Sequence, residues 1–200
     1  MNFTNLLFRL VFITLLSTPI FTEKNTEEEE KGDSFEGFIE DLIYYPGLFD
    51  SYRNDNNGKV YLLLKKNQLD REFIYFAHIL DGIVQAGTWR GSYLDNGIIK
   101  FKKYFDQIRI ERINTAYVFD IDNPLSRSNN ANISNSLIDS IKIEKSSEQG
   151  DKYLIDITSL LLSENLSKII PAPNKESSKD DFKIGSISRN KSSINNIKNY

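Results

Sequence analysis

Short stretches in which apolar and polar residues alternate recur along this chain, and this two-residue period limits the fold more than any other feature. Ile98 to Phe105 and Gln107 to Ile113 are separated only by Asp106, and Ala116 to Ile121 follows after a second polar break. Successive side chains of a β-strand point to opposite faces, so the pattern predicts a meander of antiparallel strands.

Other segments fit the same kind of structure. The apolar stretches between Leu48 and Leu64 flank Asn54-Asp55-Asn56-Asn57-Gly58, residues that tolerate a tight turn, and this predicts a β-hairpin. Leu137 to Glu144 and Tyr153 to Thr158 alternate and are expected to pair, and Ser159 to Leu166 changes to a helical spacing. We expect a mainly β fold: an antiparallel sheet or sandwich of about seven to nine strands, with one short helix and disordered ends.

One segment, Phe73 to Leu80, is apolar almost throughout. A run of this length and composition predicts a central strand that is buried on both faces. The one histidine of the chain, His78, lies inside this run. Its position favours a hydrogen-bonded histidine of the core over a catalytic one.

The two ends of the chain differ from its middle. A short start with Arg9 precedes the apolar stretch Leu10 to Phe21, which has the layout of a signal peptide and is shorter than the about 20 residues of a membrane-spanning helix. We therefore expect a signal peptide or N-terminal anchor over 1–22. The acidic run Glu27 to Glu30 indicates a solvated linker over 23–43.

The remaining sequence divides into a β-rich domain over 44–170 and a basic tail, rich in Ser and Asn, over 171–200. We expect the tail to be too polar to bury its own surface. Apolar residues nevertheless recur along it, and they predict that it docks on the surface of a partner. These residues are Phe182, Ile184, Ile187, Ile194 and Ile197.

The residue inventory excludes several kinds of chemistry. The chain has no cysteine and one histidine, so it can form neither a thiolate site nor a His-rich zinc site. Its net charge of −3 provides no field for binding nucleic acid. Asp120 and Asp122 share one strand face, but no EF-hand spacing surrounds them, and this favours a solvated strand end over a Ca²⁺ site. We expect no catalytic, cofactor-binding or metal-binding residue.

Recognition is the kind of function that this inventory leaves open. Gly82 to Gly97 contains four glycines, which predict a long loop, and it lacks the Gly-Lys-Ser/Thr sequence of a phosphate-binding loop. Trp89, Arg90 and Tyr93 lie among these glycines and are suited to stack on a sugar or clamp a peptide. Packing of the loop onto the sheet is the alternative.

Several short motifs between Tyr45 and Tyr200 match those of a known family. They are Pro46-Gly47-Leu48-Phe49-Asp50 with Tyr52, Gly58-Lys59-Val60-Tyr61, Asp81-Gly82, Tyr153 to Leu160, and Arg189 to Ser193. In these motifs the chain resembles the N-terminal, uncharacterised domains of bacterial zinc-dependent metalloproteases, which are secreted or periplasmic and have a metzincin-like catalytic part.

The resemblance implies a non-catalytic accessory region of an exported protein, periplasmic or secreted, with a scaffolding or substrate-recognition role. An uncleaved leader that anchors it to the inner membrane is the alternative location. The motif His-Glu-x-x-His-x-x-Gly-x-x-His is missing, so zinc is implied only for a catalytic domain absent from this chain, and the tail is expected to be the truncated start of a following segment.

The partner implied is a downstream catalytic domain or a separate chain, with a peptide or glycan as a further ligand. Nucleic acid is not expected, and membrane contact is expected only through the N-terminal segment. The alternative function is a stand-alone exported binding module for a glycan or peptide that uses the Gly82–Gly97 loop.

Overall fold

The computed structural model describes residues 34–84, 88–117, 122, 124, 126, 133–169 and 185–198. The segment expected to be a signal peptide or anchor, 1–22, lies outside the described residues. So does most of the expected acidic linker, together with Phe182 and Ile184 of the tail.

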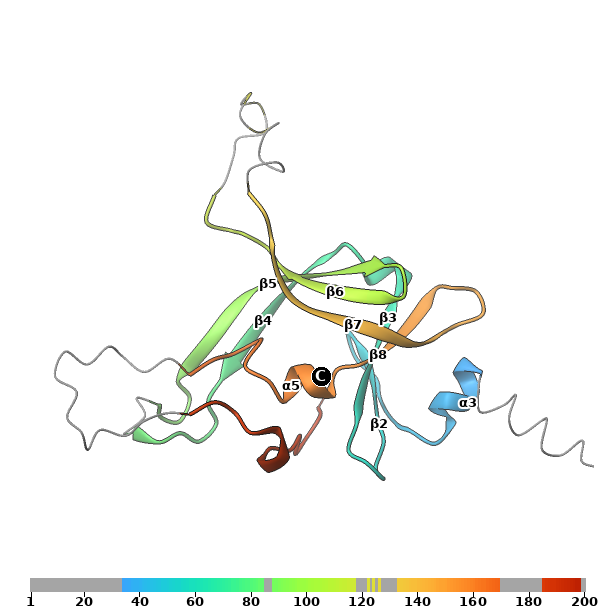
Figure 1. Ribbon diagram of the computed structural model, residues 1–200, viewed down its shortest axis with the longest axis horizontal. Coiled ribbons are helices and arrows are strands. Elements are labelled where there is room, and N and C mark those ends of the chain that lie inside the picture. Colours follow the sequence, from blue (N-terminus) through green and yellow to red (C-terminus); the bar gives the residue numbers. More distant parts are fainter. Residues whose placement is uncertain are drawn as a thin grey trace, which may run out of the picture.

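The described strands form one antiparallel sheet that curls around a concave face (Figure 1). Its eight strands lie in the order β1-β2-β3-β8-β7-β6-β5-β4. The mainly β fold is confirmed, as one curled sheet. The strands are β1 (Ile43–Tyr45), β2 (Asp50–Arg53), β3 (Val60–Lys65), β4 (Glu72–His78), β5 (Tyr93–Tyr104), β6 (Gln107–Arg112), β7 (Ser136–Ser146) and β8 (Lys152–Asp156).

Two short α-helices accompany the sheet within the described residues, one more than the sequence predicts. Helix α3 (Phe35–Glu40) begins at Ser34, whose side-chain oxygen accepts a hydrogen bond from Gly37 N at 3.0 Å. Helix α5 (Thr158–Leu161) follows β8, as expected, but it ends well before Leu166. Single 3₁₀ turns form η1 (Lys66–Gln68) and η4 (Arg189–Lys191).

The predicted hairpin is present as β2 and β3, which pair from Asp50↔Leu63 to Arg53↔Val60. Its turn depends on two residues. Asn54 Oδ1 accepts a hydrogen bond from Asn56 N at 2.9 Å, and Gly58 has a φ of +71°, which favours glycine.

The predicted meander is confirmed for its first two strands, since β5 and β6 pair on either side of a tight turn. The next strand in the ladder is β7, which pairs with β6 and, as predicted, with β8. Ala116 and Tyr117 are not in a strand, and the rest of the strand expected up to Ile121 lies outside the described residues.

The central position predicted for Phe73 to Leu80 is wrong. Phe73 to His78 belong to β4, the last strand of the sheet, and Ile74 and Phe76 are 69% and 56% exposed. Phe73 and Tyr75, on the other side of the strand, pack against the core. In this protein the continuous apolar run is therefore an edge strand, and the face that it exposes is apolar too.

The central strands are β3 and β8, and they are buried on both faces. Val60, Leu64 and Ile155 belong to a cluster on the concave face, where Leu160 of α5 joins them. Leu63 and Leu154 point the other way and pack with Phe35, Phe38 and Ile39 of α3 on the convex face. Figure 1 shows the two helices on different sides of the sheet.

Contacts between distant parts of the sequence close the concave core. Val60 N donates a hydrogen bond to Thr158 Oγ1 at 2.8 Å, across 98 residues of chain. Ile194 and Ile197, in the tail, pack against the same cluster. The expectation that these two isoleucines dock on a partner is therefore wrong, because they complete the core of their own domain.

The first prediction concerns Leu154, which is fully buried between β8 and α3. Leu154→Ala should lower the free energy of unfolding by about 2 to 5 kcal/mol, because it removes buried methyl groups and leaves a cavity. Leu161→Ala is the matched control, since Leu161 is 41% exposed and should cost much less. Urea denaturation followed by circular dichroism measures both. Equal losses for the two variants would contradict the assigned burial.

Candidate functional site

The one histidine does not lie in the core. His78 ends β4 and is exposed, with its ring centroid 4.4 Å from that of Tyr93 and 6.4 Å from that of Phe76. The prediction of a buried, hydrogen-bonded histidine is wrong, because the strand that carries it lies at the edge of the sheet. Its closest described neighbours are aromatic rings rather than a metal-binding or catalytic set.

No metal site emerges from the described part of the chain, where no three His, Cys, Asp or Glu side chains gather. Asp120, of the carboxylate pair considered above, lies outside that part. A zinc centre therefore does not fit the residues described. None of the helices among these residues is long and apolar enough to cross a membrane.

The Gly82–Gly97 loop has an ordered base. Thr88 is buried, and its hydroxyl donates to Ile83 O and accepts from Ile83 N, each at 2.9 Å. A Cβ at Gly82 would lie 2.7 Å from the Thr88 backbone, so this glycine allows the close approach. Residues 85–87, including Gly87, lie outside the described residues.

The three predicted ligand-binding residues have different surroundings in the structure. Trp89 is 59% exposed, and Arg90 pairs with Asp81 at 2.9 Å, with both side chains exposed. Tyr93 is not in the loop, because it begins β5 and lies against His78. Among the contacts of the described residues, Tyr93 meets Phe76 and His78, and none joins the side chains of Trp89 and Tyr93.

An apolar surface on the outer side of the sheet was missed by the sequence reasoning. It consists of Ile74, Phe76 and His78 of β4 and Tyr93 of β5, and we call it the β4 outer surface. The rings of Phe76 and Tyr93 lie 6.0 Å apart, edge to face. The loop that follows β4 adds more exposed apolar side chains, namely Leu80, Ile83, Val84 and Trp89.

Charged residues border the β4 outer surface. On the neighbouring strands Lys102 pairs with Glu111 at 2.9 Å, and Arg109 stacks on Tyr104 with 3.5 Å between its guanidinium carbon and the ring centroid. Lys100 pairs with Glu72, at the start of β4, at 3.5 Å. The apolar surface thus ends where the sheet becomes solvated.

A polar cluster joins β4, β5 and β6 on the concave side. Asp95 accepts a hydrogen bond from Tyr75 at 3.0 Å and forms an ion pair with Arg112, whose guanidinium carbon lies 5.3 Å from the Tyr75 ring centroid. Gly97 leaves room for that ring, since a Cβ there would lie 3.0 Å from it. Asp95 also accepts from Asn96 N at 2.8 Å, so its two oxygens are already used.

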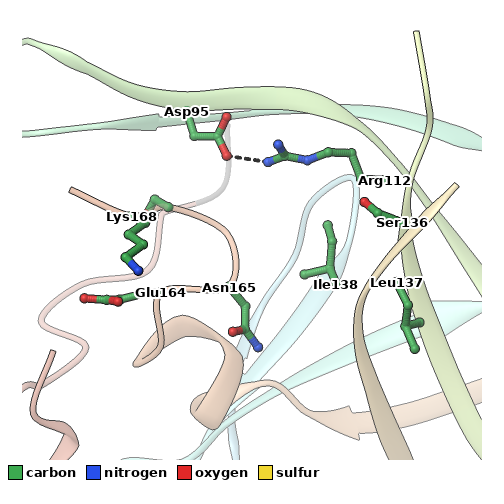
Figure 2. Close-up of a pocket in the computed structure, with 9 residues that line it drawn as sticks. Asp95, Arg112, Ser136, Leu137, Ile138, Glu164, Asn165 and Lys168 are labelled. Atoms are coloured by element: carbon green, nitrogen blue, oxygen red, sulfur yellow. Dashed lines mark hydrogen bonds and ion pairs between the residues drawn. The ribbon is translucent and has the colours of Figure 1, made fainter. Parts of the chain in front are cut away.

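A cleft of about 340 Å³ opens beside this cluster (Figure 2). It lies between the strands and the segment after α5, which contributes Glu164, Asn165, Ser167 and Lys168. Glu164 accepts a hydrogen bond from Ile187 N at 3.1 Å, and this contact ties the tail to the domain. Because the carboxylates of the cleft serve internal contacts, its geometry favours a structural role over a catalytic one.

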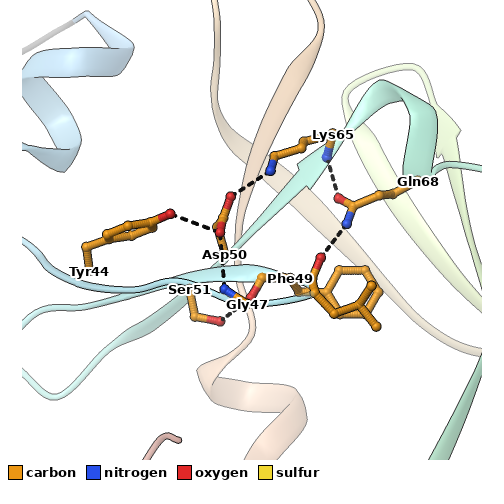
Figure 3. Close-up of polar contacts among 8 residues, drawn as sticks. Tyr44, Gly47, Phe49, Asp50, Ser51, Lys65 and Gln68 are labelled. Atoms are coloured by element: carbon orange, nitrogen blue, oxygen red, sulfur yellow. Dashed lines mark hydrogen bonds and ion pairs between the residues drawn. The ribbon is translucent and has the colours of Figure 1, made fainter. Parts of the chain in front are cut away.

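The loop Pro46–Asp50, which carried part of the resemblance, is also structural. Figure 3 shows Asp50 at the centre of a network: Oδ1 accepts from Tyr44 at 3.0 Å and from Gly47 N at 3.3 Å, and Oδ2 pairs with Lys65 at 2.9 Å. Gln68 continues it by donating to Leu48 O at 2.6 Å. The network fixes β1, β2 and the end of β3 together.

This network sets the ionisation of Asp50. Burial opposes the charged form, but hydrogen bonds from Lys65, Tyr44 and Gly47 outweigh it and hold the pKa of Asp50 below its usual value. The hydrogen bond between Tyr44 and Asp50 also raises the pKa of the Tyr44 phenol. Folding therefore favours the ionised form of Asp50.

The second prediction follows from that pKa. Asp50→Asn should lower the free energy of unfolding at pH 7 by about 1 to 3 kcal/mol, because it removes a charged acceptor. Since the pKa is lower in the folded state, the contribution of Asp50 is complete well above the unfolded-state pKa of about 4 and is lost progressively as pH falls through the folded pKa. Urea melts from pH 7 to pH 3 should show the difference between the two proteins narrow toward the acid end.

Asp81→Asn is the matched control for this measurement. It makes the same chemical change in the exposed pair with Arg90, where the expected cost is below about 1 kcal/mol. A cost for Asp50→Asn no larger than that of the control, or independent of pH, would contradict the assigned network.

Comparison with known proteins identifies one relationship. A family model described as a domain of unknown function (DUF5117) matches residues 91–200, from the end of the glycine loop through β5–β8, α5 and the tail. No curated protein and no solved structure matches the chain. Since the matched residues make up more than half of the 200, the chain belongs to the DUF5117 family.

Proposed function

We propose that this chain is a non-catalytic accessory region of an exported zinc-dependent metalloprotease-like protein, and that it binds unfolded polypeptide for that protein. Two of the motifs that resemble metalloprotease N-terminal domains, Tyr153 to Leu160 and Arg189 to Ser193, lie within the range of the family match. The observation that carries the proposed recognition role is the exposed β4 outer surface.

An exposed apolar surface of this kind is characteristic of an interaction site. Soluble proteins rarely leave several large apolar side chains together in water, and where they do, the surface commonly binds another molecule. Ile74, Phe76 and Tyr93 gather on one side of the sheet, and exposed aromatic residues carry much of the energy of binding. Trp89 and the rest of the loop extend the apolar area beyond the end of β4.

An unfolded polypeptide suits this surface because it exposes the apolar side chains that a folded protein buries. It is also the form in which a protease cleaves most chains. The zinc would belong to a catalytic part supplied by the same polypeptide or by a separate chain. The place of action is the periplasm or the cell exterior, with anchoring to the inner membrane by an uncleaved leader as the alternative.

The third prediction uses Trp89, the single tryptophan of the chain, as a reporter. Titration with reduced and carboxymethylated ribonuclease A, an unfolded polypeptide without tryptophan, should change the fluorescence emission of Trp89. Phe76→Ser should weaken this binding about tenfold or more, as expected when an aromatic anchor is truncated.

Ile43→Ser is the matched control, because Ile43 is an exposed apolar residue of the strand at the opposite edge of the sheet. Its affinity should stay within about twofold of wild type. Failure of the wild-type chain to bind the unfolded polypeptide, or equal weakening by the two variants, would refute the recognition role.

The second candidate function is a stand-alone binding module for a glycan or peptide that uses the Gly82–Gly97 loop. The observation in its favour is the exposure of Trp89 beside the Arg90–Asp81 pair. Titration with chitohexaose and with an oligogalacturonate tests the glycan form. A change in Trp89 emission that Phe76→Ser leaves intact and Arg90→Ala weakens would favour this function over the first.

A further inference from the structure

Among the described residues, no strand pairs with the outer edge of β4, so backbone groups along this edge are unpaired. Residues of an antiparallel strand direct their peptide groups alternately at one neighbour and at the other. Ile113 N donates to Ile98 O at 2.8 Å, so the peptide groups of Ile98 point toward β6. Those of Ile99 and Gly97 therefore point toward β4. Phe73 and Tyr75, which pair with Ile99 and Gly97, direct their own peptide groups toward β5.

The alternate residues of β4 direct their backbone groups away from β5. Ile74 and Phe76 direct their N–H and C=O groups outward, and β5 is the one strand of the described residues that pairs with β4. Such an edge readily accepts another strand. The available hydrogen bonds thus lie beside the apolar side chains of the β4 outer surface.

The two edges of the sheet are protected differently. At one edge, β1 has three residues and is followed directly by Pro46, which limits further pairing. At the other edge, β4 has seven residues and contains neither lysine nor proline. Since proteins usually block exposed edges with short strands, lysine or proline, the open β4 edge indicates a specific partner.

The sequence of β4 is complementary to itself in the antiparallel direction. When two copies are aligned about Tyr75, Ile74 of one lies opposite Phe76 of the other on the outer side. Glu72 then lies opposite His78, at both ends of the paired strands. Ile74 and Phe76 are the residues whose peptide groups face outward, so this alignment also matches the free hydrogen-bonding groups.

We propose that two copies of this chain pair through their β4 edges, antiparallel and about a two-fold axis at Tyr75, and so join two eight-stranded sheets into one. The β4 outer surfaces of the two copies then form one continuous apolar face. Each pair of facing side chains is favourable: an apolar contact between Ile74 and Phe76, and a carboxylate–imidazole contact between Glu72 and His78.

Neighbouring registers lack this complementarity. An axis at Phe76 would place Glu72 opposite Leu80, and an axis at Ile74 would place Glu72 opposite Phe76. A shift of one residue would set outer residues against inner ones. Charge and apolar matching therefore select the axis at Tyr75. Lys100, 3.5 Å from Glu72, and Tyr93, beside His78, are titratable groups next to the contact, and the phenol of Tyr75 lies at the axis itself.

The fourth prediction concerns the association of the full chain. Sedimentation equilibrium should give a reversible dimer of the 23.1 kDa chain. His78→Glu should weaken the dimer about tenfold, because it places two carboxylates opposite each other at both ends of the paired strands. Adding Glu72→His to that variant exchanges the two residues and should restore dimerisation to within about threefold of wild type.

Cross-linking tests the register directly, because the chain has no cysteine of its own. Oxidation of a mixture of Ile74→Cys and Phe76→Cys chains should give a disulfide-linked dimer, while each variant alone should cross-link far less. This readout is separate from polypeptide binding, so the association and the recognition role can fail independently.

Three outcomes would overturn the association. They are a chain that stays monomeric up to roughly 0.1 mM, a dimer unaffected by His78→Glu, and cross-linking of Phe76→Cys alone in preference to the mixture. The first would exclude a dimer of useful affinity. The others would place the contact elsewhere or in another register.

Discussion

The burial of β3 and β8 on both of their faces is the constraint on which the rest of this structure depends. Leu62↔Ile155 and Leu63↔Leu154 pair in the middle of the sheet, and each pair sends its side chains to a different face. One face then requires α5 and the tail as cover, and the other requires α3. The open edge and the exposed outer surface of β4 arise where this double cover stops.

Much of the fold could be predicted from sequence because turns and alternation are local signals. The Asn54–Gly58 turn, the β5–β6 meander and the pairing of β7 with β8 all join segments that are close in the chain. The position of β4 could not be predicted in this way. An apolar run has the same composition in a strand that is buried on both faces and in a strand that has one face exposed to solvent. Sheet order, which decides between these cases, depends on contacts across long stretches of sequence.

The candidate site was predicted less well, for a related reason. Trp89, Arg90 and Tyr93 are close in sequence, but Tyr93 already belongs to β5, and it meets Phe76 and His78 across the β4–β5 ladder. The Asp50 network likewise joins residues from β1, the loop after it and the end of β3. Asp50 did belong to a motif that the sequence analysis singled out, although its role in the structure is to fix the sheet.

The hydrogen bond from Val60 to Thr158 and the packing of Ile194 also govern the order in which the protein can fold. During synthesis β3 emerges with both faces apolar, and its second neighbour is not made until nearly a hundred residues later. Until then the nascent sheet has no central partner strand, and pairing across such a separation is slow. The central sheet of this chain can therefore be completed only after its last third has been translated.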